Sequence, residues 1–138
     1  LSSALVDMAL HTQPDGVIDA DRFERETLTR LGMPREIVMR HRLPHFNHLF
    51  SSDAYSAGYY SYLWSDVMAA DSWAAFQETG NVWDPATAQR FGRWILQSGN
   101  EVDRAEAYRQ FRGRDPDVDA LLRDRGFPTG APASGTRR

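Results

Sequence analysis

Helix start and stop signals recur along this chain and constrain its fold more than any other feature of the sequence. Asp19 can cap a helix that carries apolar residues at helical spacing and stops at Gly32. Proline at a first helical turn predicts further helix starts at Pro34 (through Val38), Asp84-Pro85 and Asp115-Pro116. No stretch alternates between apolar and polar residues with the period of two that strands show. The sequence therefore predicts an all-α protein.

The longest predicted helix runs from about Ser56 to about Thr79, and Gly58 interrupts its start. A glycine inside a helix costs up to about 1 kcal/mol relative to alanine, so Gly58 indicates a local bend or the close approach of another backbone. Trp64 and Trp73 are expected to fill the larger spaces beside this helix. Its predicted buried stripe is Tyr60, Leu63, Val67, Ala70 and Ala74.

The composition excludes several classes of protein. With 138 residues, 41% of them hydrophobic, the chain can form one domain with its own core. The net charge is -3 and the basic residues form no stripe, which argues against a nucleic-acid partner. The absence of cysteine excludes disulfides, and no apolar run reaches the roughly 18 residues that span a membrane. We expect a cytoplasmic protein without membrane contact, with a disordered tail at residues 128–138, "PTGAPASGTRR".

Tyrosines are concentrated in the stretch "YSAGYYSYLW", residues 55–64. On a helix, Tyr55, Tyr59 and Tyr62 fall at i, i+4 and i+7, so that three phenol groups share one face while Tyr60 points elsewhere. A buried phenol must find a hydrogen-bond partner, and phenylalanine or leucine would serve packing alone better. The pattern therefore predicts a row of hydrogen-bond donors.

Three interpretations of this region remain open from residue spacing alone. The tyrosines and nearby histidines can lie at the edge of the core with their polar tips in water. Alternatively, His41, His45 and His48 can bind zinc, although Pro44 breaks a continuous helix through them and neither carboxylate nor thiolate is close in sequence. In the third interpretation, the phenols donate hydrogen bonds to the carbonyl oxygens of a peptide-like ligand.

The longer sequence around the tyrosines favours the third of these interpretations. The run "MRHRLPHFNHLFSSDAYSAGYYSYLWSDV" resembles the segment just after the zinc site in the thimet oligopeptidase and peptidyl-dipeptidase family of zinc metallopeptidases, and most resembles its bacterial dipeptidyl carboxypeptidase branch. The likeness continues through "DPATAQRFGRWIL" and "AYRQFRGRDPDVDALLRDRGF", and more loosely back to "SSALVDMALH". The resemblance implies that residues 1–127 are the helical C-terminal portion of a zincin-type catalytic domain.

The resemblance also implies a role for each residue of the tyrosine string. Tyr62 would donate to the oxyanion that develops at the scissile carbonyl, and Tyr59 would bind substrate backbone beside it. His48 would contact substrate backbone or the tetrahedral species, and Tyr55 would close over the C-terminal side of the substrate. Where many relatives have a glycine-rich loop this chain has "LFSSDA", and Gly58 is the glycine that remains.

The zinc-binding motif of the family is absent from the sequence. The family uses His-Glu-x-x-His plus a later glutamate, but none of His11, His41, His45 and His48 is followed by Glu. The resemblance therefore implies a fragment of a peptidase that releases C-terminal dipeptides from oligopeptides, with zinc ligands upstream of Leu1 and no activity by itself. The alternative is a non-catalytic helical peptide-binding module.

Two further expectations concern surfaces. Without the upstream part of the catalytic domain, exposed tryptophans would favour self-association of the fragment. Arg112-Gly113-Arg114 could bind an anion, but an ion-paired or solvated helix boundary is the favoured interpretation of this run.

Overall fold

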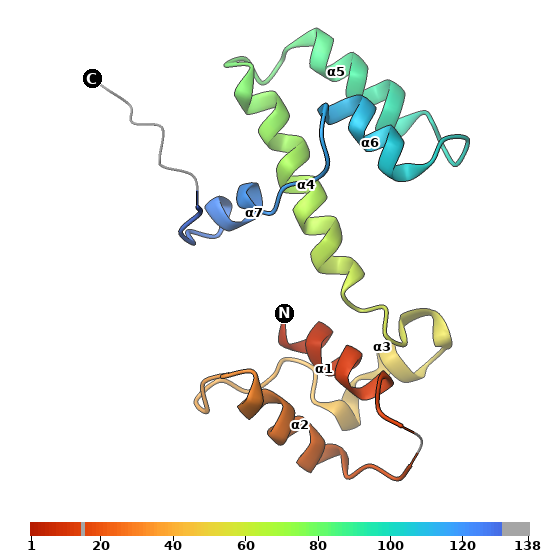
Figure 1. Ribbon diagram of the computed structural model, residues 1–138, viewed down its shortest axis with the longest axis vertical. Helices are drawn as coiled ribbons and strands as arrows, with labels where there is room; N and C mark the ends of the chain where they lie inside the picture. The colour runs from red at the N-terminus through yellow and green to blue at the C-terminus, as the bar shows by residue number, and fades with distance from the viewer. Residues whose placement is uncertain (15, 131–138) are drawn as a thin grey trace. The chain divides into compact units, whose positions relative to one another are not determined.

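The computed structural model describes residues 1–14 and 16–130, and over these ranges it contains helices and no strands (Figure 1). The predicted all-α class is confirmed. The predicted disordered tail lies, from residue 131 onward, outside the described residues. The elements in chain order are α1 (Ser2–His11), α2 (Ala20–Arg30), η1 (Leu43–His45), α3 (Asn47–Phe50), η2 (Asp53–Tyr55), α4 (Ser61–Glu78), α5 (Pro85–Phe91), η3 (Gly92–Leu96), α6 (Arg104–Arg112) and α7 (Asp119–Asp124).

Contacts within the chain divide it into two compact units, Leu1–Leu63 (unit 1) and Trp64–Arg138 (unit 2). The boundary falls inside α4, close to the start of that helix. Each unit has its own cluster of buried apolar side chains. Tyr55, Tyr59, Tyr60 and Tyr62 all belong to unit 1.

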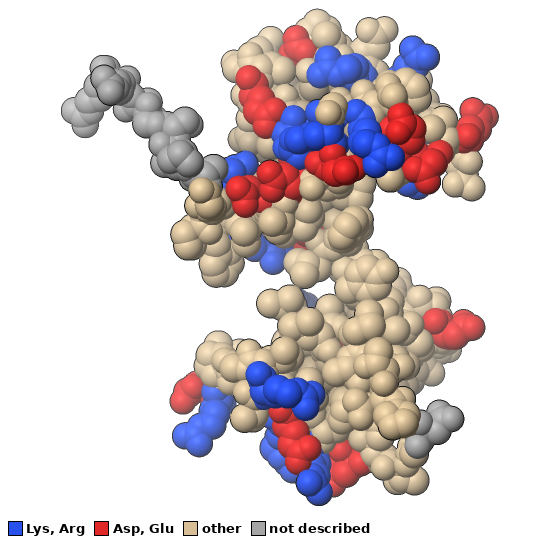
Figure 2. All heavy atoms as spheres, viewed as in Figure 1, with Lys and Arg blue, Asp and Glu red and all other residues tan. Residues whose placement is uncertain are grey.

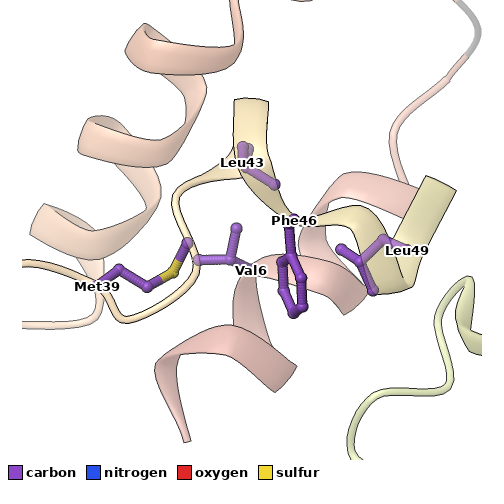
Figure 3. Close-up of a cluster of buried hydrophobic side chains, with 5 residues drawn as sticks. All are labelled: Val6, Met39, Leu43, Phe46 and Leu49. Carbon is purple, nitrogen blue, oxygen red and sulfur yellow. The ribbon is translucent and has the colours of Figure 1, made fainter. Parts of the chain in front are cut away.

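Unit 1 is built around side chains from α1, η1, α3 and the segment before η1. Figure 3 shows these side chains pointing toward one another. Burial of each such side chain contributes about 1.5–3 kcal/mol to folding. Every member is at most 3% exposed; the cluster is Val6, Met39, Leu43, Phe46 and Leu49.

Two polar contacts organise the second helix of unit 1. The Asp19 carboxylate accepts from the backbone N–H of Arg22 at 3.0 Å, which confirms the predicted cap of α2. Glu24, only 3% exposed, accepts from the backbone N–H of Leu43 at 2.8 Å and pairs with Arg42. This contact ties α2 to η1.

The helix predicted from Pro34 is wrong, because residues 34–38 form a turn. A single turn bond joins the Ile37 N–H to the Pro34 carbonyl at 3.1 Å. Ile37 and Val38 are 59% and 69% exposed, so no apolar contact supports a helix there.

Unit 2 packs α5, η3 and α6 against α4. Its buried centre is Ala75, Tyr108 and Phe111, and the Phe91 ring meets Phe111 edge-on with centroids 5.3 Å apart. The predicted cap Asp84 accepts from the Thr87 N–H at 2.7 Å. The predicted start at Asp115-Pro116 is wrong, since α7 begins at Asp119 and its N-cap residue is Val118.

A buried carboxylate joins α4 to the end of α6. Asp71, 0% exposed, accepts from the Tyr108 hydroxyl at 2.7 Å and from Arg114 Nη2 at 2.6 Å. Arg112 Nη2 lies 3.3 Å from Asp71 Oδ1, and Arg112 Nη1 donates to Glu78 at 2.7 Å. The predicted ion-paired boundary at Arg112-Gly113-Arg114 is confirmed. Figure 2 accordingly shows acidic and basic side chains next to each other over α6.

The exposure of α4 differs from the predicted stripe. Its buried residues are Asp71, Ala74 and Ala75, whereas Tyr60 precedes the helix and is 50% exposed. Trp64 and Trp73, which were expected to fill interior spaces, are 59% and 49% exposed. Of the stripe, Ala74 alone is fully buried, because α6 covers one side of α4 only. In the part of the chain that the structure describes, no helix is long and apolar enough to cross a membrane.

Candidate functional site

The tyrosine string does not form one helix, contrary to the prediction. Tyr55 ends η2, residues 56–60 form turns, and α4 begins at Ser61. Ala57 has a φ of 56°, in the left-handed region that a non-glycine residue rarely adopts. The backbone between Tyr55 and Tyr62 is therefore not helical. The three phenols cannot share a face through helical i, i+4 and i+7 spacing.

A buried carboxylate from α1 explains this turn. Asp7, 0% exposed, accepts from the backbone N–H of Ala57 at 3.0 Å and from that of Tyr59 at 2.9 Å. His11 Nδ1 lies 2.8 Å from Asp7 Oδ1. Amide groups that would otherwise need helical or solvent partners are thereby satisfied by a side chain. The prediction from the sequence missed Asp7, whose only signal is an Asp–His pair at i, i+4 on an otherwise largely apolar segment.

Gly58 lies between the two amides that Asp7 binds. A Cβ at this position would be 3.4 Å from the Ala54 carbonyl oxygen and 3.6 Å from the Tyr55 Cα, which are ordinary van der Waals distances. The backbone of residues 54 and 55 therefore lies close to Gly58, as predicted, but not so close that only glycine fits. The unusual backbone conformation of the turn is at Ala57.

The rings of the string nevertheless converge, with Tyr59 at their centre. We call this group the Tyr59 cluster, and it lies entirely in unit 1. The structure brings together all four aromatic residues that the sequence singled out as a substrate face, together with His41 and Phe46. Ring-centroid distances from Tyr59 are 4.8 Å to Phe46, 5.0 Å to Tyr62, 5.6 Å to His41, 5.8 Å to His48 and 6.4 Å to Tyr55.

Tyr55 and Tyr62 form a stacked, hydrogen-bonded pair at the edge of this cluster. Their rings are 5.9 Å apart with an interplanar angle of 4°, and the Tyr62 hydroxyl donates to the Tyr55 hydroxyl at 3.1 Å. This hydrogen bond, with smaller contributions from burial and the other tyrosines, raises the pKa of Tyr62. Tyr62 is 47% exposed, so its phenol is a neutral hydrogen-bonding group that a ligand can reach.

The two histidines of the Tyr59 cluster differ in exposure and in their contacts. His48 is exposed and meets the Tyr55 ring edge-on at 5.4 Å. His41 stacks on Phe46 at 4.7 Å, and its Nδ1 lies 3.1 Å from the Ser3 hydroxyl. Burial, with the charges of Arg40 and His48, lowers the pKa of His41.

A zinc site at His41, His45 and His48 is not supported. Within residues 1–14 and 16–130 there is no group of three or more histidine, aspartate or glutamate side chains that could hold a metal ion. His41 takes part in the ring cluster, and its centroid is 6.5 Å from that of His48. The residues present therefore do not fit a zinc ion.

The family model for "Peptidase family M3" matches residues 1–127. The chain belongs to peptidase family M3. The resemblance stated from the tyrosine string is confirmed, because relatives in this family include oligopeptidases and a dipeptidyl carboxypeptidase.

Individual relatives agree with the family assignment. Oligopeptidase A of Haemophilus influenzae is 45% identical over 87 residues, which is 62% of this chain and 12% of that protein. Dipeptidyl carboxypeptidase of Escherichia coli is 36% identical over 130 residues, 92% of this chain and 19% of that protein. Saccharolysin of Saccharomyces cerevisiae is 37% identical over 85 residues, 59% of this chain and 11% of that protein. The M3 chain thus spans less than a fifth of the length of each of these relatives.

Proposed function

We propose that this chain forms one wall of the substrate cleft of an M3 metallopeptidase that hydrolyses oligopeptides and releases C-terminal dipeptides. The observation that carries the proposal is the Tyr59 cluster, in which the His48 imidazole from α3 meets three phenols, from η2, the turn after it and the start of α4. The name of the Escherichia coli relative supports dipeptide release, and the name of the Haemophilus influenzae relative supports oligopeptide substrates.

Tyr62 and Tyr59 are the proposed catalytic groups. Hydrolysis of a peptide bond places negative charge on the scissile carbonyl oxygen, and neutral donors aimed at that oxygen stabilise the transition state. A phenol is protonated at neutral pH, and the pKa of Tyr62 is raised further above neutrality by its hydrogen bond with Tyr55. The Tyr62 O–H can turn about its C–O bond, so Tyr62 can transfer its hydrogen bond from the Tyr55 hydroxyl to the substrate oxygen.

His48, Tyr55 and Gly58 are the proposed substrate-binding residues. His48 and Tyr55 lie edge to face at the accessible side of the cluster, where an imidazole N–H and a phenol can bind main-chain carbonyls of a peptide. Gly58 carries no side chain between the two amides that Asp7 binds, and its proposed role is to let the backbone of an extended peptide come close to the turn.

Zinc and its ligands are proposed to lie outside these 138 residues. The sequence has no His-Glu-x-x-His motif, and the described residues offer no ligand set. We expect the chain to require a metal-binding partner segment and to cleave no peptide by itself.

A chimaera tests the proposal most directly. Residues 1–127 replace the aligned segment of Escherichia coli dipeptidyl carboxypeptidase, and kcat and product masses are measured with oligopeptide substrates. Tyr62→Phe is expected to lower kcat by roughly 100- to 1000-fold, as for the loss of one oxyanion donor. Tyr60→Phe is the matched control, because Tyr60 is 50% exposed and lies outside the cluster. Equal kcat for the two variants would overturn the proposed role of Tyr62.

A non-catalytic peptide-binding module is the second candidate, favoured by the lack of metal ligands among the described residues. This function predicts that the isolated chain binds a short oligopeptide at the Tyr59 cluster while the chimaera stays inactive. Perturbation of the tyrosine signals in NMR spectra by an added tetrapeptide separates it from the fragment of a peptidase.

A further inference from the structure

Asp7 is placed where an aspartate is costly. It lies in the middle of α1, is 0% exposed, and directly follows Val6 of the unit 1 core. Aspartate is a poor residue for a helix interior, and burying its charge requires compensating hydrogen bonds. Both carboxylate oxygens accept backbone hydrogen bonds, and both of these bonds come from the turn before α4.

We propose that Asp7 is the positioning residue of the Tyr59 cluster, and that His11 orients its carboxylate. This inference rests on the proposed function, because it assigns Asp7 a role in aiming the phenols at a substrate. Asp7 Oδ1 binds the amide of Ala57 and Asp7 Oδ2 binds the amide of Tyr59, so one carboxylate holds both sides of Gly58.

One of the two hydrogen bonds is made by Ala57, the residue of the turn with the least favourable backbone conformation. Ala57 adopts a φ of 56°, a left-handed conformation that is unfavourable for a residue with a Cβ. The two hydrogen bonds to the Asp7 carboxylate lie on either side of Gly58, next to this residue, and favour that conformation. Tyr59 follows two residues later, so that its backbone, and with it the central ring of the cluster, is fixed by Asp7.

His11 completes the arrangement from the next turn of α1. Its Nδ1 lies 2.8 Å from Asp7 Oδ1, and its side chain is 25% exposed whereas that of Asp7 is buried. The same nitrogen lies 3.0 Å from the Asp7 backbone carbonyl oxygen and 3.3 Å from the Ala57 amide nitrogen, so the imidazole touches both the carboxylate and the turn that the carboxylate binds. A neighbour in this position limits the rotation of the carboxylate, as a partner does for a catalytic or ligating group. The chain thus links α1 to the tyrosine loop through one carboxylate oriented by one imidazole.

Glu24 provides a matched comparison within unit 1. It is also almost fully buried, at 3% exposure, and also binds one backbone N–H, that of Leu43 at 2.8 Å. Its hydrogen bond and its ion pair go to Leu43 and Arg42, not to the tyrosine turn. Glu24→Gln therefore reproduces the loss of a buried charge without touching the tyrosine turn.

The test uses the 138-residue chain labelled with 3-fluorotyrosine and followed by ¹⁹F NMR. Asp7→Asn keeps the size of the side chain but turns one acceptor into an N–H₂ group that faces an amide N–H. We expect the signals of Tyr55, Tyr59 and Tyr62 to shift and broaden, while Tyr108 in unit 2 stays unchanged. Hydrogen exchange at the amides of Ala57 and Tyr59 is expected to accelerate by about tenfold. Glu24→Gln leaves the three tyrosine signals in place.

Because loss of a buried carboxylate can unfold unit 1, His11→Ala is measured as well. It keeps the carboxylate and the core, and is expected to move the same three signals to a smaller extent. A folded Asp7→Asn or His11→Ala chain with all three tyrosine signals at their original positions overturns the positioning role.

Activity of the chimaera then separates this inference from the proposed function. With positioning, Asp7→Asn lowers kcat by about 10- to 100-fold with a smaller change in KM, since misaligned donors lose transition-state contacts. Tyrosine signals that move while kcat stays unchanged would support positioning by Asp7 and contradict the catalytic role of the phenols. If the tyrosine signals stay in place in Asp7→Asn while Tyr62→Phe lowers kcat, the positioning role of Asp7 is contradicted and the catalytic role of Tyr62 is supported.

Discussion

The Tyr108 hydroxyl on α6 donates a 2.7 Å hydrogen bond to the Asp71 carboxylate on α4, and both side chains are buried. Arg112 and Arg114 approach the same carboxylate from the end of α6. A charge in the interior is stable only when its partners are in place, so this group links the two helices as a unit.

Asp71→Ala is expected to destabilise unit 2 by about 3–5 kcal/mol, because Arg112, itself largely buried, would lose its interior partner. The measurement is urea unfolding followed by tryptophan fluorescence. Asp66→Ala on the same helix is the control, since the Asp66–Arg125 pair is about half exposed and is expected to contribute at most about 1 kcal/mol. Equal midpoints for the two variants would contradict the importance of burial here.

Acid should weaken the same network. Burial alone would raise the pKa of Asp71, but hydrogen bonds from Arg114 and Tyr108 and the nearby arginine charges outweigh it and lower the pKa. A carboxyl group with a lowered folded-state pKa stabilises the fold fully above its unfolded value of about 3.9, and this contribution is lost as the pH falls through the folded value. Thermal unfolding of unit 2 is therefore expected to move to lower temperature below about pH 4, with a smaller shift in Asp71→Asn.

Tyr108 should titrate at a higher pH than an ordinary tyrosine. Burial, followed by its bond to Asp71, raises the pKa of Tyr108 to about 12. Because the folded value exceeds the unfolded value of about 10, this contribution to stability is complete below pH 10 and is lost as the pH rises toward 12. Absorbance at the tyrosinate band should show a step near pH 12 that disappears in Tyr108→Phe. A chain in which that step survives the substitution would contradict the assignment.

The sequence predicted helix caps, which depend on residues close together in the chain. It did not predict contacts between residues far apart in the chain. Asp19 and Asp84 cap the helices that they were predicted to cap, because each bond spans three residues. The Asp7–Tyr59 contact spans 52 residues and displaces the start of α4 to Ser61, which helical spacing could not reveal. The rings of the string met for a different reason than the one predicted, namely a turn held by a carboxylate.

Self-association of the isolated chain is expected from the exposed face of α4. An open groove of about 430 Å³ adjoins Trp73, with Met68, Phe76 and Ile95 among its lining side chains. Apolar surface of this kind favours association. Sedimentation velocity over a range of concentrations should show dimers, and Trp73→Ser should shift the equilibrium toward monomer. Gln77→Ser, an exposed position on the same helix, is the control. A chain that stays monomeric at high concentration would contradict this expectation.

The Tyr55–Tyr62 pair offers a prediction that needs no metal and no substrate. The hydrogen bond from Tyr62 to Tyr55 is the main cause of the raised pKa of Tyr62. Tyr55→Phe removes the partner oxygen and keeps the stacked ring, so the pKa of Tyr62 is expected to fall toward its usual value of about 10. A pH titration of the 3-fluorotyrosine chain follows this directly, with Tyr60→Phe as the control that leaves the Tyr62 signal unchanged. If Tyr62 titrates at the same pH in both variants, the bond does not form in solution, and the phenol that we assign to the substrate oxygen is oriented by ring contacts with Tyr55 and Tyr59.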